Sequence, residues 1–372
     1  MTVKPRRIAW LFAALALVAS LGGCADVRYY LQSVSGHLQM LNATRPVTEW
    51  IGDPQTPAQL RERLALTQRV RSFAVTELKL PDNPSYHRYA DLKRSAVVWN
   101  VVAAPEFSLK LKTWCFPVTG CVGYRGYFNE AAAREEEATL KVDGQETGVY
   151  GVPAYSTLGW MNWAGGDPLL NTFIGYPEGE LARLIFHELA HQVVYASGDT
   201  MFNESFATAV ERLGSQRWLA TEASDDARRA YAAFDGRRQQ FRALALGTRR
   251  ALTALYAREP ATAPAQRQQA EEKQQIMQKF RSDYAQLKDS WGGFAGYDRW
   301  VQSANNATFG AQAAYDELVP AFETLFVQQG SDWTRFYDAV KRLAAMPRAD
   351  RDSALKSLAP ATAQHLEERP HG

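Results

Sequence analysis

The sequence feature that most constrains the fold is the pentapeptide HELAH, which runs from His187 to His191. On an α-helix, residues four apart lie on one face, so both imidazoles reach a single cation when this segment is helical. Glu188 lies beside that face, where it can take a proton from a water held by the metal. Two imidazoles and one carboxylate suit zinc with an open fourth position. The motif predicts a zinc-binding helix, and the alternative is a pair of surface histidines.

A second motif, NESFAT, begins at Asn203. HELAH followed by NESFAT resembles the gluzincin metallopeptidases, in which a second helix presents a glutamate ligand from an Asn-Glu-x-Phe-Ala segment. The resemblance implies Glu204 as the third ligand, and Glu211, two turns further, as a partner that orients a ligating histidine. Asp199 competes for the ligand role on position alone, but its segment SGDT is typical of a turn.

The composition excludes several other classes of protein. The 372 residues include 46% apolar and 22% charged residues, which is ordinary globular usage and not that of a disordered chain. The formal net charge is only +2, whereas nucleic-acid binders need a basic surface to displace counterions from phosphate. We therefore expect a folded protein that does not bind nucleic acid.

The N-terminus predicts export. Three cationic residues precede a small and apolar run over residues 8–23, which is typical of a secretory signal and too short for a comfortable membrane span of roughly 20 residues. The run ends in LGGC, which resembles a bacterial lipobox with cleavage before Cys24 and acylation of its thiol. Because Ala25 and not Asp follows, the lipoprotein sorting pattern implies anchoring to the outer membrane, facing the periplasm. The alternative is an ordinary signal peptide with an incidental cysteine.

The other two cysteines, Cys115 and Cys121, flank the short loop FPVTG. Because the periplasm is oxidising, this compartment favours a disulfide between them. Pro117 and Gly120 supply the turn chemistry that brings two Cβ atoms together. Zinc ligation by the pair is the alternative, but no second pair of Cys or His lies nearby.

Hydrophobic periodicity predicts an α+β chain that is mostly α. Within the zincin-like core that the resemblance to gluzincins implies, this pattern predicts a small mixed sheet, the HELAH helix and a following helix, on which the resemblance places Glu204. A C-terminal helical hairpin should succeed the core. Helices are expected over residues 59–78, 131–140, 178–194, 203–218, 225–258, 266–291 and 311–343, the last broken around Gly330. Strands are expected over residues 95–104, 109–114, 122–128 and 148–155, the second and third forming a hairpin around the cysteine loop.

Five regions follow from this pattern. They are a lipoprotein signal peptide (1–23), an N-terminal helical region (24–94), a zincin-like catalytic core (95–220), a helical C-terminal region (221–345) and a polar tail expected to be disordered (346–372).

The chain as a whole resembles a bacterial family of predicted aminopeptidases, many of which are lipoproteins. The pieces that carry this resemblance are LGGC, WCFPVTGCVGYRGYF, AYSTLGW, DPLLNTFI, HELAHQ and NESFATAVE. The resemblance implies a peptidase that removes N-terminal residues. It extends over most of the chain after the signal.

Several residues are candidates for binding substrate. Tyr124 and Tyr127 lie in YRGYF, which is either an edge strand that holds an extended peptide or an aromatic strand packed on the core. A peptidase also stabilises the negative charge that develops on the carbonyl oxygen, and a carboxylate that pairs with the substrate ammonium would suit an aminopeptidase. Asp167 is a candidate for the second role, or is simply a turn residue. For the first role the candidates are Tyr155, Tyr195 and Arg125.

Together these features predict a membrane-tethered zinc metallopeptidase that acts on peptides with Glu188 as general base, and the resemblance favours an aminopeptidase. Two alternatives share the metal site: an endopeptidase and a cell-wall amidase. A third is a periplasmic binding or chaperone-like protein with a structural zinc. The sequence gives no indication of the oligomeric state.

Overall fold

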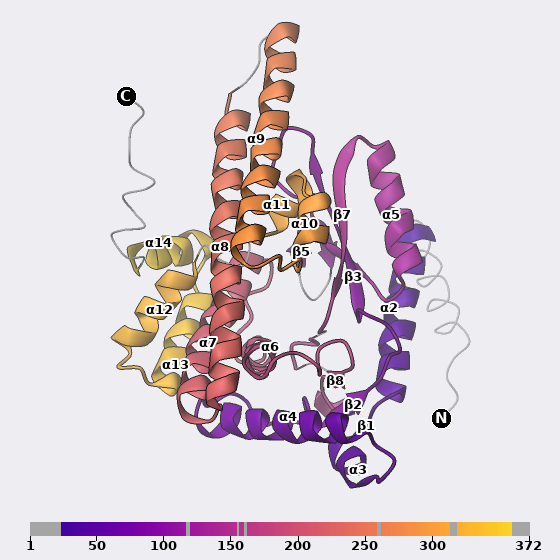
Figure 1. Ribbon diagram of the computed structural model, residues 1–372, viewed down its shortest axis with the longest axis vertical. Coiled ribbons are helices and arrows are strands. Elements are labelled where there is room, and N and C mark those ends of the chain that lie inside the picture. The colour runs from indigo at the N-terminus through magenta and orange to yellow at the C-terminus, as the bar shows by residue number, and fades with distance from the viewer. Residues whose placement is uncertain are drawn as a thin grey trace, which may run out of the picture.

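The computed structural model describes residues 24–116, 120–154, 156–159, 162–258, 262–312 and 318–358. Over these residues the chain is mostly helical with small sheets, as predicted for an α+β protein. The expected signal peptide lies outside the described residues. Helices α6 and α7 occupy the centre, with a small sheet on one side and the C-terminal helices on the other (Figure 1).

The main sheet is built around β3 (Val98–Pro105). This strand pairs antiparallel with β6 (Arg125–Tyr127) on one side and with β7 (Gln145–Val152) on the other. Its side chains alternate: Trp99 and Val101 pack toward α5 (Glu130–Val142), while Val102 packs toward α11 (Asn306–Gln312). The run that the sequence identified as a strand is therefore buried on both faces.

The cysteine loop forms a shorter hairpin than the sequence predicts. Only β4 (Trp114–Phe116) and β5 (Gly120–Val122) pair with each other, and the structure joins Cys115 to Cys121 by a disulfide. Residues 109–113 form no strand, and residues 125–127 pair with β3 in place of the hairpin. A further small sheet joins β1 (Arg45–Pro46), β2 (Arg88–Ala90) and β8 (Leu169–Leu170).

The helical core surrounds α6 (Glu178–Ala190) and α7 (Thr200–Thr221), which pack against each other. Gly214 of α7 allows this close approach, because a Cβ at that position would lie 3.0 Å from Cδ2 of Phe186. Below them run α4 (Ala58–Thr76) and α3 (Val47–Gly52) (Figure 1). Phe73 of α4 lies edge-on to Trp218 of α7, with ring centroids 5.1 Å apart.

The predicted helical hairpin is confirmed as α8 (Asp225–Tyr256) and α9 (Ala263–Ser290). Its outer end projects beyond the rest of the molecule (Figure 1). The sequence predicts the break over residues 259–265, of which 259–261 lie outside the described residues, whereas α9 already begins at Ala263. Phe241 and Phe280 pack inside the hairpin against residues that include α10 (Asp298–Gln302).

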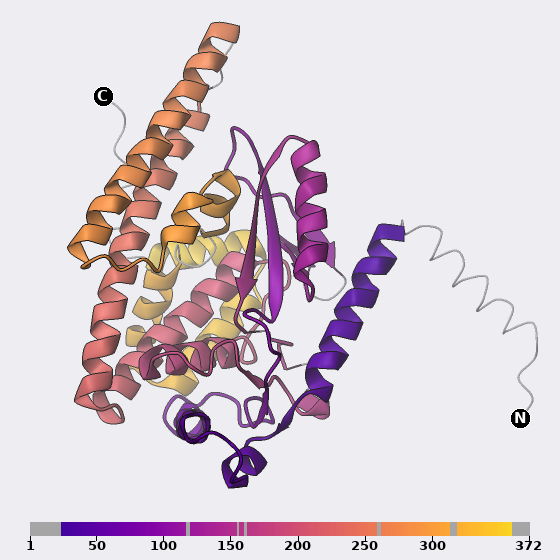
Figure 2. The same cartoon turned by 45° about the vertical axis from the view of Figure 1, so that its right-hand side comes forward.

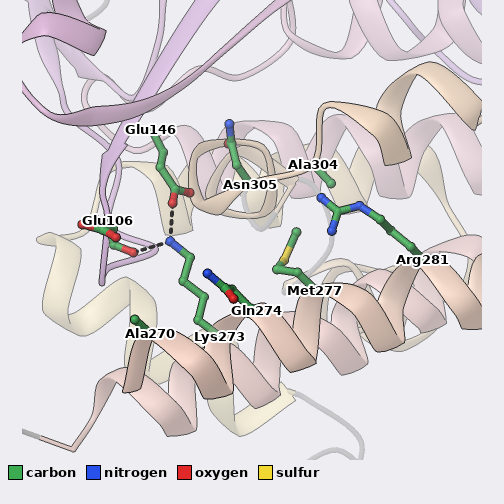
Figure 3. A pocket seen from close by; sticks show the side chains of 9 residues that line it. All are labelled: Glu106, Glu146, Ala270, Lys273, Gln274, Met277, Arg281, Ala304 and Asn305. Carbon is green, nitrogen blue, oxygen red and sulfur yellow. Dashed lines mark hydrogen bonds and ion pairs between the residues drawn. The ribbon is translucent and has the colours of Figure 1, made fainter. Parts of the chain in front are cut away.

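The hairpin is also fixed to the sheet. Lys273 of α9 donates to the carbonyl of Glu106 at 2.7 Å and pairs with the carboxylate of Glu146 (Figure 3). A cavity of about 290 Å³ lies beside this contact.

The C-terminal part corrects one expectation. Helices α12 (Val319–Gln328) and α13 (Trp333–Ala344) are separated at Gly330, which has a φ of 72° and ends the first helix as predicted. The disorder expected from residue 346 onward is wrong for α14 (Arg348–Leu358), which packs on α12 and α13. The sequence suggested a polar tail because five of the eleven residues of this helix are charged. Its apolar residues Ala354, Leu355 and Leu358 nevertheless pack on the core.

At the other end, α2 (Cys24–Asn42) lies along the outside of the sheet (Figure 2). Among the described residues, no helix combines the length and the apolar content needed to cross a membrane.

Candidate metal centre

Helix α6 presents the HELAH motif. Its first turn carries Glu178 and Glu180, whose negative charges interact favourably with the positive N-terminal end of the helix dipole and stabilise the helix. An apolar face that includes Ile185 and Leu189 is fully buried. The helix ends at Ala190, but His191 keeps helical angles (φ −59°, ψ −21°), so the spacing of four residues still places both imidazoles on one side.

Helix α7 brings in the glutamate. Asp199 caps its N-terminus by accepting from the amide of Phe202 at 3.1 Å. Asn203 fixes the preceding loop, because its side chain accepts from the amide of Ala196 at 2.7 Å and donates to the carbonyl of Ala196 at 2.8 Å. The short connection between HELAH and NESFAT therefore closes as a rigid turn, and Glu204 faces the two histidines.

Three donor atoms come together at this point. Nε2 of His187 lies 3.2 Å from Nε2 of His191 and 3.3 Å from Oε2 of Glu204, and Nε2 of His191 lies 3.7 Å from the same oxygen. Ligands of a tetrahedral zinc at 2.0–2.1 Å are separated from one another by about 3.3 Å. The three atoms therefore already have the spacing that a zinc ion requires.

The chemistry of the donors also fits a cation. Nδ1 of His187 lies 3.0 Å from Oε2 of Glu211 and donates its proton to that carboxylate, so Nε2 is the nitrogen that faces the cluster. Nδ1 of His191 is buried and has no hydrogen-bond partner in the described part of the chain. The His187, His191 and Glu204 group can thus hold a metal ion.

Glu211 belongs to a longer chain of alternating charges. Its other oxygen pairs with Arg183 of α6, and Arg183 lies 3.3 Å from Glu180. Arg238 of the α8 hairpin donates to both oxygens of Glu180, at 2.8 and 2.7 Å. The hairpin is therefore linked through four ion pairs to a candidate metal ligand, His187.

The electrostatics of the cluster favour positive charge at its centre. Burial alone would lower the pKa of His187, but hydrogen bonds to Glu204 and Glu211 outweigh burial and raise it well above its usual value. Burial would raise the pKa of Glu211, but Arg183 and His187 lower it to about 2. The pKa of Glu204 is likewise lowered because the two imidazoles outweigh burial. Both carboxylates are therefore ionised at neutral pH.

Glu188 has a different environment. Burial raises the pKa of its carboxyl, and the neighbouring histidines oppose this shift. In the described residues, no hydrogen bond or ion pair is found for its carboxylate, in contrast to Glu204 and Glu211. A buried carboxyl with a raised pKa suits a group that accepts and releases a proton.

Tyrosines surround the cluster, including one that the sequence analysis missed. Tyr124 and Tyr195 were expected, and burial raises the pKa of both, with a contribution from the negative charge of Glu204. Tyr150 of β7 shares this environment, and burial raises its pKa as well. It was missed because the sequence predicts a strand over residues 148–155 but does not show which of its side chains face the HELAH helix. Tyr155 lies outside the described residues.

Arg125 and Tyr127 lie elsewhere, which corrects the roles predicted for them. The guanidinium of Arg125 lies 4.2 Å from the ring centroid of Tyr29 and 3.5 Å from the carboxylate of Glu136. Tyr127 packs on the same face, against Tyr29 and α5. Successive residues of a strand alternate between faces, so Tyr124 and Arg125 point in opposite directions.

Asp167 also departs from its expected role at the rim. It is 1% exposed, and its oxygens accept from the amide and the hydroxyl of Thr157, at 3.0 and 2.7 Å, and from the side chains of Ser156 and Gln192. Burial raises its pKa to about 6, although Thr157 opposes the shift. A carboxylate so enclosed orders the loop beside Gln192 and does not face substrate.

Asp199 is excluded as a ligand by its partners. Besides capping α7, it pairs with Arg351 of α14, whose Nε and Nη2 lie 3.0 and 2.6 Å from Oδ2.

Some residues near the site were not indicated by the sequence. Arg183 and Arg238 are among them, because they act through contacts with residues distant in sequence. Tyr86 is a further residue near the cluster that the sequence did not indicate. Its backbone φ is 69°, and burial, together with the negative charge of Glu188, raises the pKa of its hydroxyl.

The cavity beside Lys273 does not belong to this cluster. Its lining comes from α9, from the β3–β7 end of the sheet and from Asn305 (Figure 3). Lys273 pairs there with Glu146, whose other carboxylate oxygen accepts from the backbone amide of Asn306 at 2.7 Å, which is typical of a structural junction.

Comparison with known proteins agrees with the site. No curated protein and no solved structure gives a significant match to the chain. One family model, described as "Putative aminopeptidase", matches residues 28–355, a span that includes HELAH, Glu204 and the helical hairpin. This match covers most of the chain, which therefore belongs to the putative aminopeptidase family.

Proposed function

We propose that this protein is a zinc metallopeptidase in which His187, His191 and Glu204 hold the metal and Glu188 is the general base. The observation that carries the proposal is the spacing of the three donor atoms, 3.2 to 3.7 Å apart. Family membership supports a peptidase-like hydrolase independently.

Each residue of the proposed site has a separate role in the reaction. A bound zinc ion would polarise the peptide carbonyl and acidify the attacking water. Glu188 takes a proton from that water and returns it to the leaving amine nitrogen, so its carboxyl ends the cycle as it began. Glu211 keeps the proton on Nδ1 of His187, which holds Nε2 as a lone-pair donor. The hydroxyls of Tyr124, Tyr150, Tyr155 or Tyr195 are the candidates to donate to the developing oxyanion.

The aminopeptidase specificity rests on the family. Asp167 is buried, so a different group would have to receive the substrate ammonium. One peptide with a free and with an acetylated N-terminus tests this point. Cleavage of the free form alone supports an aminopeptidase, and internal cleavage of the acetylated form at a similar rate rejects it while leaving the metal site intact.

We also propose that the chain is exported and tethered to the outer membrane by a lipid on Cys24, as the LGGC motif suggests. Replacing Cys24 with Ser should release the protein into the soluble periplasmic fraction. Unchanged fractionation of that variant would reject the tether.

Metal analysis tests the core of the proposal. The purified protein should hold about one zinc per chain. His191→Ala should lose most of it, whereas the control His87→Ala should keep it, since His87 lies on the surface and contacts Gln68. A wild-type chain that binds no zinc even after supplementation at neutral pH would end the proposal.

A further inference from the structure

The outer face of α2 is apolar and exposed. Tyr30, Leu31, Val34 and Leu38 are 44, 66, 58 and 51% exposed, and their spacings of three and four residues place them on one side of the helix. The other large apolar side chains exposed among the described residues occur singly on different segments. They are Val142, Trp163, Tyr176, Val327 and Met346.

The opposite face of α2 is fixed to the body of the protein. Tyr29 stacks on Phe116 of the disulfide hairpin, with ring centroids 5.6 Å apart. The side chain of Gln32 accepts from the amide of Phe128 at 3.0 Å. Gly36 lies so close to Phe128 that a Cβ would approach the ring to 2.3 Å. These contacts determine which side of the helix faces outward.

The apolar face of α2 begins close to Cys24, the residue that we propose to be lipidated. Cys24 is the first residue of α2, and Leu31 follows it by two helical turns. The helix of 19 residues is about 28 Å long and points away from the sheet at its N-terminal end (Figure 2). A lipid on Cys24 would therefore bring a bilayer to the start of this face.

We infer that the outer face of α2 lies in the headgroup region of the bilayer to which Cys24 is tethered. A helix that is fixed to the protein on one side and apolar on its exposed side can bury that exposed side in the interface and run along the membrane. Leu31, Val34 and Leu38 supply the apolar contact, and Arg28 is the exposed cation at the same end. The helix thereby orients the peptidase on the membrane. This inference rests on the proposed tether.

Fluorescent labelling of single cysteines in the lipidated full chain tests the inference. Cys115 and Cys121 are paired and Cys24 is acylated, so a thiol label reacts with an introduced cysteine. The test variant is Val34→Cys, and the matched controls are the exposed valines of α5 and α12, Val142→Cys and Val327→Cys. Each carries an environment-sensitive dye and is reconstituted into phosphatidylethanolamine–phosphatidylglycerol vesicles that contain nitroxide-labelled lipid.

The dye at position 34 should shift to the blue and lose fluorescence to the nitroxide, while the dyes at 142 and 327 should do neither. If all three dyes behave alike although the protein floats with the vesicles, the inference is overturned and the tether stands. If position 34 instead forms crosslinked dimers and is not quenched, a second copy covers the face and the inference is overturned. A chain that does not float overturns both the tether and the inference.

Discussion

Nδ1 of His187 and Oε2 of Glu211 lie 3.0 Å apart, although 24 residues separate them in sequence. The contact fixes one tautomer of the imidazole and so prepares its other nitrogen for a metal. Glu211, two turns beyond the candidate ligand Glu204, thus orients the candidate ligand His187 on the neighbouring helix.

Replacing Glu211 with Gln should weaken zinc binding by about 10- to 100-fold, because an amide holds the Nδ1 proton less strongly than a carboxylate does. Competition with a chromogenic chelator measures the change. Glu222→Gln, at the C-terminal end of the same helix and on the surface, is the control and should leave affinity unchanged. Equal affinities for all three proteins would contradict the role of Glu211.

Arg351 should be essential for stability. It is 5% exposed and pairs with Asp199, which is 3% exposed, so Arg351→Met would leave a buried carboxylate without its partner. We expect a loss of about 3–5 kcal/mol in the free energy of unfolding, measured with urea. The control Arg348→Met removes an exposed pair on the same helix and should change stability by less than about 0.5 kcal/mol. Similar effects from the two variants would show that α14 is not held by this ion pair.

Asp167 should make stability depend on pH. Burial raises its pKa to about 6 from an ordinary value of 3.8, so the folded state favours the protonated carboxyl. The stabilisation is fully present below pH 3.8 and is lost as the pH rises through 6. Relative to Asp167→Asn, the wild type should lose about 3 kcal/mol over this interval. Urea unfolding of metal-free protein across that range measures it, and a constant difference between the two proteins would contradict the prediction.

Gly36 should tolerate no side chain. Gly36→Ala places a Cβ against Phe128 and should cost about 1–3 kcal/mol, since α2 must shift. Gly247 lies within α8 with nothing near its Cβ position, so Gly247→Ala should instead stabilise the protein by about 0.5–1 kcal/mol. Thermal unfolding compares the two. A neutral Gly36→Ala would mean that α2 packs loosely on the sheet.

The sequence predicts what depends on local spacing. The HELAH helix, the second helix with Glu204 and the hairpin of α8 and α9 all follow from periodicity or short motifs, and the structure contains these elements. The faces of Arg125 and Tyr127 could not be predicted, because β6 has only three residues and its orientation depends on pairing with β3. Their neighbour Tyr124 was chosen by the same argument and lies on the opposite face.

Contacts between segments that are distant in sequence could not be predicted either. Arg183 and Arg238 look like ordinary charges on solvated helix faces until the fold places Glu180 between them. Similarly, Arg351 lies in a polar segment and becomes a core residue only through Asp199, 152 residues earlier. Such pairs carry no local pattern, since each partner is common on protein surfaces.

We propose that Glu188 transfers protons beside a zinc ion held by His187, His191 and Glu204. The most direct test is the turnover of a free N-terminal peptide by wild type and by Glu188→Gln, with zinc content measured on the same samples. We expect equal zinc in both proteins and a fall in kcat of about 100- to 10,000-fold in the variant. Undiminished turnover by a zinc-loaded Glu188→Gln protein would contradict it.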